Sequence, residues 1–308
     1  MTKSFGLRVC TLLLCVFSGP SYSLQLFDGQ SFLYDIGPDG ALMRGTREAY
    51  AGMYHLRVKG ANYVGNILRL SPDGREVRRE VFAEPGSGLE VRRNLYVSKT
   101  QNFARFSEIL HNPTDAPITV DVEVYGKLGA GSRTVAVADQ GNFLITDDVI
   151  DDESGTMPVL LHYHSQVNSP VTATHTLRGN QLSWVYSNVT VPAQSQVRLI
   201  YFVAQTTDLA VAHQVATLVF SNPSALYEDM GQTARGQLLN FKAPNPIPRD
   251  DDEGDFSNAP FLNLGELRMG ALEEDDAWSH RRMATPAEAY ALNLAADETF
   301  NKYVFRSH

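Results

Sequence analysis

Cysteine is nearly absent from this chain. The only two, Cys10 and Cys15, lie within the first 23 residues, a segment that we expect to be removed. The mature chain then has no disulfide, and zinc–thiolate sites and cysteine nucleophiles are excluded. Residues 24–308 are still numerous enough to bury a hydrophobic core without covalent cross-links.

The first 23 residues have the order of a signal peptide. Lys3 and Arg8 precede an apolar run, Val9 to Phe17, and small or turn-forming residues from Ser18 to Ser23 follow it. The run is about half of the ~20 residues that span a bilayer, and Ser23 suits a signal peptidase. A buried N-terminal strand is the alternative. We expect cleavage after Ser23 and an exported protein, either periplasmic or secreted to the cell surface, with no membrane span once the signal peptide is removed.

Positive charge is scarce, since the formal net charge is −9. Nucleic acid is therefore excluded as a partner, because its phosphates require a dense basic surface. The densest group of arginines is interrupted by glutamates and is expected to cover solvated strand faces; it comprises Arg75, Arg78, Arg79, Arg92 and Arg93.

Recognisable catalytic motifs are also lacking. The sequence has no Gly-x-Ser-x-Gly elbow, phosphate loop, dinucleotide fingerprint or His-Glu-x-x-His zinc helix. No catalytic or cofactor-binding residue is therefore assigned, and no cofactor is expected apart from a calcium ion discussed below. A pair of glycosidase carboxylates cannot be judged from sequence, because only their separation in space identifies it.

What the chain does have is strand periodicity. From Ile118 to Tyr125, aliphatic residues alternate strictly with polar ones, which is typical of an antiparallel strand with one buried face. Turns are expected at Pro38-Asp39-Gly40 and Pro72-Asp73-Gly74. A hairpin or corner is expected at His111–Pro117. The run from Val197 to Val203 is apolar on both faces and is expected to be a central strand.

The full set of expected strands is regularly spaced, which favours a mainly β fold, an antiparallel β-sandwich or supersandwich. The strands are 32–36, 54–59, 63–70, 76–82, 90–97, 103–110, 118–125, 133–138, 142–146, 159–164, 171–177, 181–186 and 195–204.

Two short helices are expected after the strands. Thr207 or Asp208 can cap the first, and Asn222 with Pro223 can open the second. The chain from Lys242 to Pro260 is then rich in proline and acid. We expect a β domain with closing helices over 24–241 and a low-order, acidic, partly helical tail over 242–308.

Two groups of residues are candidate metal ligands. His162 and His164 are two apart in an expected strand, so both imidazoles face the same side and could share a metal ion or a proton. The alternative is a pair of half-exposed strand histidines. A second group could bind calcium through carboxylates or could be a solvated acidic loop; it comprises Asp147, Asp148, Asp151, Asp152 and Glu153.

Two stretches of the sequence resemble β-rich modules of large exported bacterial surface and matrix proteins. They are FLYDIGPDGALMRGTREAYAGM and RFSEILHNPTDAPITVDVEVYGKLGAGSRT. The resemblance covers residues 24–241. It implies a supersandwich-like fold, carries no established activity and transfers no catalytic residue.

Two functions remain open. In the first, the protein is an exported, non-catalytic β module that binds an envelope or extracellular protein or a surface glycan. In the second, it is a glycan-active enzyme with carboxylates or histidines on a concave sheet face. The first is preferred at this point, because it requires no motif that the sequence lacks.

Overall fold

The computed structural model describes residues 24–65, 68–148, 157–244 and 262–263. The signal peptide expected over residues 1–23 and nearly all of the tail lie outside these ranges and stay predictions. No helix within them is long and apolar enough to cross a membrane.

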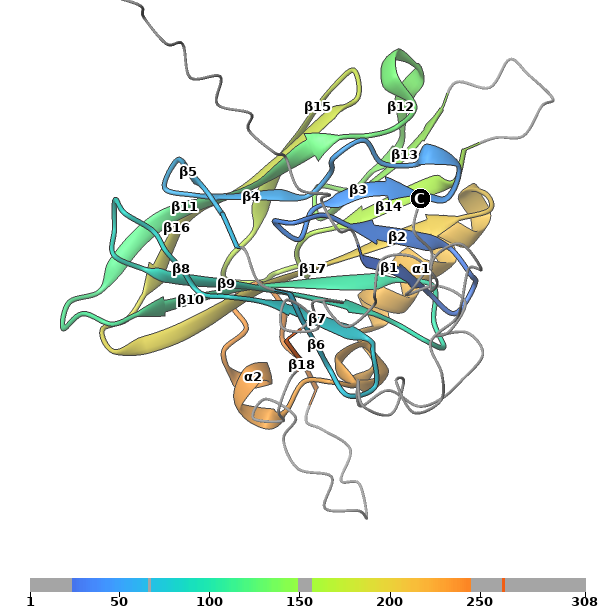
Figure 1. The fold of residues 1–308 in the computed structure, drawn as a ribbon. Helices are drawn as coiled ribbons and strands as arrows, with labels where there is room; N and C mark the ends of the chain where they lie inside the picture. The colour runs from blue at the N-terminus through green and yellow to red at the C-terminus, as the bar shows by residue number, and fades with distance from the viewer. Residues whose placement is uncertain (1–23, 66–67, 149–156, 245–261, 264–308) are drawn as a thin grey trace, which may run out of the picture.

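The main element is a ten-stranded antiparallel sheet (Figure 1). Its order is β12-β13-β14-β17-β10-β9-β7-β6-β18, and β8 pairs with β9 beside this path. The strands are β6 (Leu68–Leu70), β7 (Glu76–Arg79), β8 (Phe82–Ala83), β9 (Glu90–Val97), β10 (Ala104–Asn112), β12 (Thr134–Asp139), β13 (Phe143–Asp148), β14 (Val159–Tyr163), β17 (Ser195–Thr206) and β18 (Leu262–Asn263).

A five-stranded antiparallel sheet and a three-stranded one complete the β structure. The five-stranded sheet has the order β15-β16-β11-β4-β5 and contains β4 (His55–Val58), β5 (Ala61–Asn62), β11 (Ile118–Lys127), β15 (Ala173–Arg178) and β16 (Gln181–Val191). The three-stranded sheet contains β1 (Leu24–Phe27), β2 (Leu33–Ile36) and β3 (Leu42–Gly45).

The helices are few and short. They are α1 (Leu209–Ser221), α2 (Gln232–Gly236) and the 3-10 turns η1 (Thr46–Glu48), η2 (Gly131–Arg133) and η3 (Ser224–Tyr227). The side chain of Asp208 caps α1 by accepting a hydrogen bond from the Val211 amide at 2.9 Å.

Two hydrophobic cores lie on opposite faces of the large sheet. The larger contains residues from all three sheets, including Phe106, Trp184 and Tyr201. The smaller packs the other face of the large sheet, including Phe202, against Val215 of α1 and the segment that follows it. This division follows from strand alternation, because neighbouring residues such as Tyr201 and Phe202 point to opposite faces.

The expected antiparallel β-sandwich is confirmed. Strand β17 is central, between β14 and β10, and the aliphatic residues Val120, Val122 and Val124 of β11 are buried as the alternation indicates. The turn at His111–Pro117 is a corner, because β10 and β11 belong to different sheets.

Three expectations about elements were wrong. No single strand spans residues 63–70: Ala61–Asn62 and Leu68–Leu70 pair in different sheets. The strands β1 and β3 were not expected. The second helix does not begin at Pro223: Asn222 adopts a left-handed conformation (φ 52°) that ends α1, the 3-10 turn η3 follows, and the short α2 begins at Gln232.

Candidate functional site

Polar side chains converge around the tight turn between β2 and β3. Gly37 and Ala41 close the turn, with the Gly37 amide donating to the Ala41 carbonyl at 2.8 Å. Gly40 has φ +82°, a left-handed conformation that glycine adopts without strain. The turn predicted at Pro38-Asp39-Gly40 is thus present, and it places the Asp39 carboxylate within hydrogen-bonding distance of β4.

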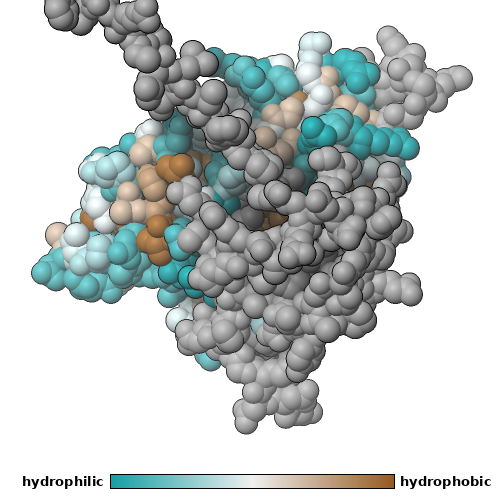
Figure 2. All heavy atoms as spheres, in the orientation of Figure 1, coloured by the Kyte–Doolittle hydropathy of each residue, from teal (hydrophilic) through white to brown (hydrophobic). Residues whose placement is uncertain are grey.

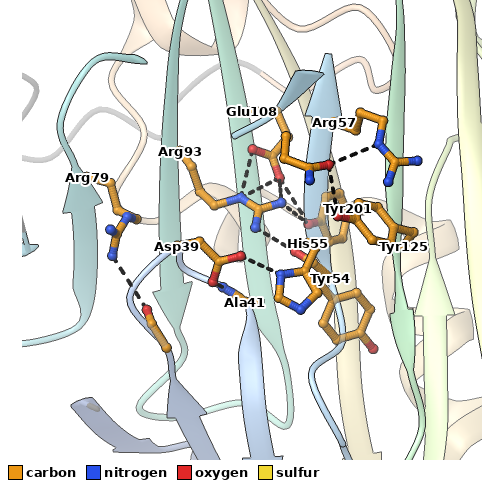
Figure 3. Close-up of polar contacts among 12 residues, drawn as sticks. Asp39, Ala41, Tyr54, His55, Arg57, Arg79, Arg93, Glu108, Tyr125 and Tyr201 are labelled. Atoms are coloured by element: carbon orange, nitrogen blue, oxygen red, sulfur yellow. Dashed lines mark hydrogen bonds and ion pairs between the residues drawn. The ribbon is translucent and has the colours of Figure 1, made fainter. Parts of the chain in front are cut away.

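Asp39 forms an acid–histidine pair with His55, the first residue of β4 (Figure 3). One carboxylate oxygen bonds Nδ1 of His55, and the other accepts from the Ala41 amide at 3.1 Å. Burial alone would raise the pKa of Asp39, but the hydrogen bond and charge of His55 outweigh it, and the pKa is lowered to about 2. Asp39 is therefore ionised near neutral pH, and Nδ1 of His55 carries the shared proton.

The pair is accessible from solvent. The side chains of Asp39 and His55 are 24% and 30% exposed. Tyr125 stands directly opposite His55 in the β11–β4 register, with ring centroids 5.5 Å apart. Arg57 covers Tyr125 at 4.3 Å from its ring centre, and both donate to the side-chain oxygen of Asn62. The surroundings of His55 therefore combine one aromatic ring with several hydrogen-bonding groups.

Close to Asp39 lies a buried ion pair between Arg93 and Glu108. Nε of Arg93 donates to both carboxylate oxygens at 3.0 Å, and Nη2 donates to one of them at 2.6 Å. Burial alone would lower the pKa of Arg93, but the charge of Glu108 outweighs it and raises that pKa. Nη1 of Arg93 donates to the carbonyl of Tyr54 at 2.5 Å. Tyr54 directly precedes His55 and has φ +67°, an uncommon value for a bulky residue.

Arg79 is the second buried arginine beside the turn (Figure 3). It is 3% exposed, and its Nη1 forms one long hydrogen bond, 3.5 Å, to the Gly37 carbonyl. Within the described part of the chain Nε and Nη2 make no hydrogen bond of normal geometry, but the hydroxyl of Tyr63 interacts with the guanidinium. Burial lowers the pKa of Arg79, against the opposing effects of Tyr63 and, to a smaller extent, of the charge of Asp39.

The expectation that the arginines cover solvated strand faces is therefore wrong for Arg79 and Arg93. Arg92 and Arg93 are neighbours in β9, so they point to opposite faces of the sheet, and Arg93 enters the core at 1% exposure. The alternation of side chains along the strand was the signal in the sequence that could have located this buried arginine.

His162 and His164 do face the same side, but their side chains have no common hydrogen-bond partner. His162 bonds Tyr54 at 2.8 Å and Thr146 at 3.0 Å, so both of its ring nitrogens are engaged. His164 bonds His175 at 3.0 Å, and His175 in turn bonds the exposed Asp139 at 3.1 Å. Half-exposed histidines were also expected, and this was wrong, because both are 0% exposed.

The acidic group lies only partly within the described ranges. Asp147 and Asp148 end β13, whereas Asp151, Asp152 and Glu153 fall outside them. Asp148 is 7% exposed and Arg133 lies 3.7 Å from it. In the part of the chain that the structure describes, no three histidines, cysteines or acids converge as a metal site. Calcium binding at this group stays a prediction.

A cavity of about 600 Å³ lies elsewhere, between residues 166–170, α2 and residues 238–244. Its lining contains no acidic residue and no histidine. Arg235 lines it, but its guanidinium donates to Met230, Ser224, Pro244 and Tyr227. This cavity therefore offers no carboxylate or imidazole for proton transfer, unlike the turn around Asp39.

Comparisons with known proteins find similarity only in structure. No family model and no curated protein matches the sequence. A putative kojibiose phosphorylase from the human microbiome aligns with 65% of this chain and 32% of its own, at TM-score 0.41 and 9% identity. A putative aldose 1-epimerase from Klebsiella pneumoniae aligns with 71% of this chain and 85% of its own, at TM-score 0.39 and 10% sequence identity. A mutant of the heparan sulfate lyase HepC from Pedobacter heparinus aligns with 57% of this chain and 33% of its own, at TM-score 0.37 and 9% sequence identity.

These comparisons correct the preferred expectation of a non-catalytic binding module. The similar structures are those of a putative phosphorylase, a lyase and putative epimerases, and so agree better with the glycan-active alternative. The chain matches only about a third of the phosphorylase and of the lyase. Since the TM-scores are below 0.5, the likeness assigns no activity, and the argument for one rests on this chain's own residues.

Proposed function

We propose that this protein is a carbohydrate-active enzyme in which His55 transfers a proton at the sugar. The observation that carries the proposal is the Asp39–His55 pair, because an ionised carboxylate on Nδ1 fixes the tautomer and leaves Nε2 for the ligand. Of the two ring nitrogens of His55, only Nδ1 has a hydrogen-bond partner within the described part of the chain.

The groups around the pair suit a polyhydroxylated ligand. Tyr125 offers an apolar ring beside His55, and Arg57 and Asn62 offer donors and acceptors at partly exposed positions. Binding sites for small molecules commonly combine such an apolar surface with a few oriented polar groups. Export, as expected from residues 1–23, would place the protein with glycans outside the cytoplasm.

Hydrolysis by two carboxylates is a weaker candidate. Glu108, the carboxylate paired with Arg93, is 0% exposed, and both of its oxygens bind that arginine. A glycosidase requires two carboxyl groups on either side of a bound sugar. Proton transfer by His55 to or from a sugar oxygen or carbon requires no second accessible carboxylate.

The test is a substrate panel with a matched pair of variants. Neutral and uronic-acid sugars and oligosaccharides would be assayed for anomer interconversion by NMR, for unsaturated products by ultraviolet absorbance, and for new reducing ends. For any substrate turned over, His55→Gln is expected to lower kcat by about 10²- to 10⁴-fold. Asp39→Asn is expected to lower kcat as well, because the carboxylamide no longer fixes the tautomer.

His111→Gln is the control. His111 also bonds a carboxylate through Nδ1, that of Glu90 at 2.9 Å, but at a different part of the surface. Its replacement should leave turnover unchanged. Full activity in His55→Gln, or no turnover of any sugar in the panel by the wild-type protein, would overturn the proposal.

A further inference from the structure

A small cavity lies at the edge of the ten-stranded sheet, where β12 begins and β13 ends. Its volume is about 10 Å³, and the residues that line it include Thr134, Thr146 and Asp148. A space of this size holds one water molecule or one metal ion, and no larger ligand. Neither Asp39 nor His55 lines this cavity, so it is distinct from the site of the proposed proton transfer.

Two buried oxygen atoms at this cavity are unsatisfied. Thr134 and Asp148 stand opposite each other in the β12–β13 register, so their side chains lie on the same face of the sheet. These residues are 8% and 7% exposed. Oγ1 of Thr134 and Oδ1 of Asp148 have no hydrogen-bond partner among the residues that the structure describes. Buried polar atoms are nearly always satisfied in native proteins, so two such oxygens at one cavity point to a bound group.

The charges around the cavity favour a cation over a neutral group. Asp147, which is half-buried, lines the cavity beside Asp148. Arg133 faces the other carboxylate oxygen of Asp148, Oδ2, but the two atoms are 3.7 Å apart and the arginine side chain is 52% exposed. This contact is too long for a hydrogen bond, and a solvent-exposed arginine offsets little of a buried charge. A bound cation would offset the charge of Asp148, which a water molecule cannot do.

The atoms available at the cavity indicate the class of metal ion. They are carboxylate and hydroxyl oxygens, since the nearby His162 uses both ring nitrogens for Thr146 and Tyr54. Oxygen ligands select calcium or magnesium over zinc and copper. Calcium accepts irregular coordination completed by carbonyls and water, whereas magnesium requires a nearly ideal octahedron. The visible surface around β12 and β13 is largely hydrophilic, which suits the approach of a hydrated ion (Figure 2).

We propose that Asp148 and Thr134 bind a calcium ion in this cavity. The ion would join the start of β12 to the end of β13 and so stabilise this edge of the large sheet. Few protein ligands and a small number of carboxylates correspond to the weak affinity of extracellular calcium modules, with a dissociation constant of about 0.1–1 mM. Such an affinity is sufficient for a protein exported as residues 1–23 predict.

The test is thermal unfolding of the full-length protein after removal of metal with EDTA. The melting temperature would be compared in calcium chloride, in magnesium chloride and in sodium chloride of equal ionic strength. Calcium at about 10 mM, with a dissociation constant of about 1 mM, should raise the melting temperature by about 3–6 °C. Magnesium should raise it much less.

Two variants locate the ion. Asp148→Asn removes the charge and Thr134→Val removes the hydroxyl, and both nearly keep the shape of the side chain. Each should lose most of the rise caused by calcium. The rise is measured within each variant, so a change in stability without metal does not affect the comparison. The control is Asp115→Asn at the exposed turn between β10 and β11, which should keep the full rise.

A water molecule is the alternative occupant of the cavity. Equal melting temperatures of the wild-type protein in calcium and in sodium chloride would show it and would overturn the inference. The same calcium-dependent rise in Asp148→Asn, Thr134→Val and the wild type would place calcium at other carboxylates of this acidic chain, and would also overturn it. Sugar turnover has no part in this test, so the failure of either proposal leaves the other standing.

Discussion

Arg93 and Glu108 stand directly opposite each other on neighbouring strands, β9 and β10, and form an ion pair in the interior of the protein. Their side chains are 1% and 0% exposed, and the hydroxyl of Tyr201 donates to the same carboxylate at 3.0 Å. Every oxygen of Glu108 is therefore satisfied. The ion pair also positions the backbone just before His55, since Arg93 donates a hydrogen bond to the carbonyl of Tyr54.

Replacing Glu108 with glutamine is expected to destabilise the protein by about 3–5 kcal/mol, because the charge of Arg93 would remain buried without a counter-ion. The free energy of unfolding from urea titration measures this. Glu123→Gln is the matched control: Glu123 also stands opposite its arginine, Arg57, but those side chains are 27% and 33% exposed. Its loss should cost about 0–1 kcal/mol. Similar losses in the two variants would contradict the assigned role of burial.

The sequence predicted the sheets well because alternation and turn chemistry are local. Strand β11 and the turn at Asp39 follow directly from the order of residues, and strand β9 was predicted with the bounds that it has, Glu90–Val97. The short β1 and β3 were missed, since four residues in each give little periodicity.

The candidate site could not be predicted in the same way. Asp39 and His55 are 16 residues apart, and Arg93 and Tyr54 are 39 apart, so only the folded chain brings them together. The adjacent arginines Arg92 and Arg93 could have indicated that one of them faces inward, but the sequence analysis expected both to be solvated. The contact of Arg79 with the β2–β3 turn had no signal in the sequence either, because Arg79 and Gly37 are 42 residues apart.

Buried His162 predicts a loss of stability in acid. Burial, with a smaller contribution from His164, lowers the pKa of His162 from 6.5 to about 3. Below pH 6.5 His162 takes up a proton in the unfolded chain but stays neutral in the native protein. Its contribution to the free energy of unfolding is therefore fully present above pH 6.5 and is lost as the pH falls from 6.5 to 3. The slope is about 1.4 kcal/mol per pH unit for this histidine.

The measurement is the free energy of unfolding from urea titrations at several pH values between 7 and 4. His162→Gln should reduce the slope by about one proton, since glutamine does not titrate. His213→Gln, at an exposed position of α1, should leave the slope as it is in the wild type. The same slope in His162→Gln and the wild type would refute the prediction, because contributions from other groups cancel in this comparison.

Gly40→Ala should destabilise the turn that carries Asp39. Gly40 has φ +82°, and a Cβ there would lie 2.8 Å from Cδ of Arg93. The strain and the contact together should cost about 1–3 kcal/mol. Gly88→Ala separates the two effects, because Gly88 has φ +78° with nothing within 4 Å of the added Cβ. Thermal or urea unfolding should therefore show the larger loss for Gly40→Ala, and equal losses would mean that Arg93 moves aside freely.

Asn240 joins β17 to the residue after β14 through one buried amide, and its loss should be costly. Its oxygen accepts from the Ile200 amide at 2.9 Å, and its nitrogen donates to the carbonyls of Ile200 and His164 at 2.6 and 2.8 Å. Asn240→Ala leaves these backbone groups buried without a partner, which should lower the free energy of unfolding by about 2–4 kcal/mol. The control is Asn180→Ala, which removes a single amide bond, to the Leu128 carbonyl at 2.8 Å, at a half-buried turn. Equal urea midpoints for the two variants would show that Asn240 does not fix the end of the β domain, and would weaken the expected domain limit at residue 241.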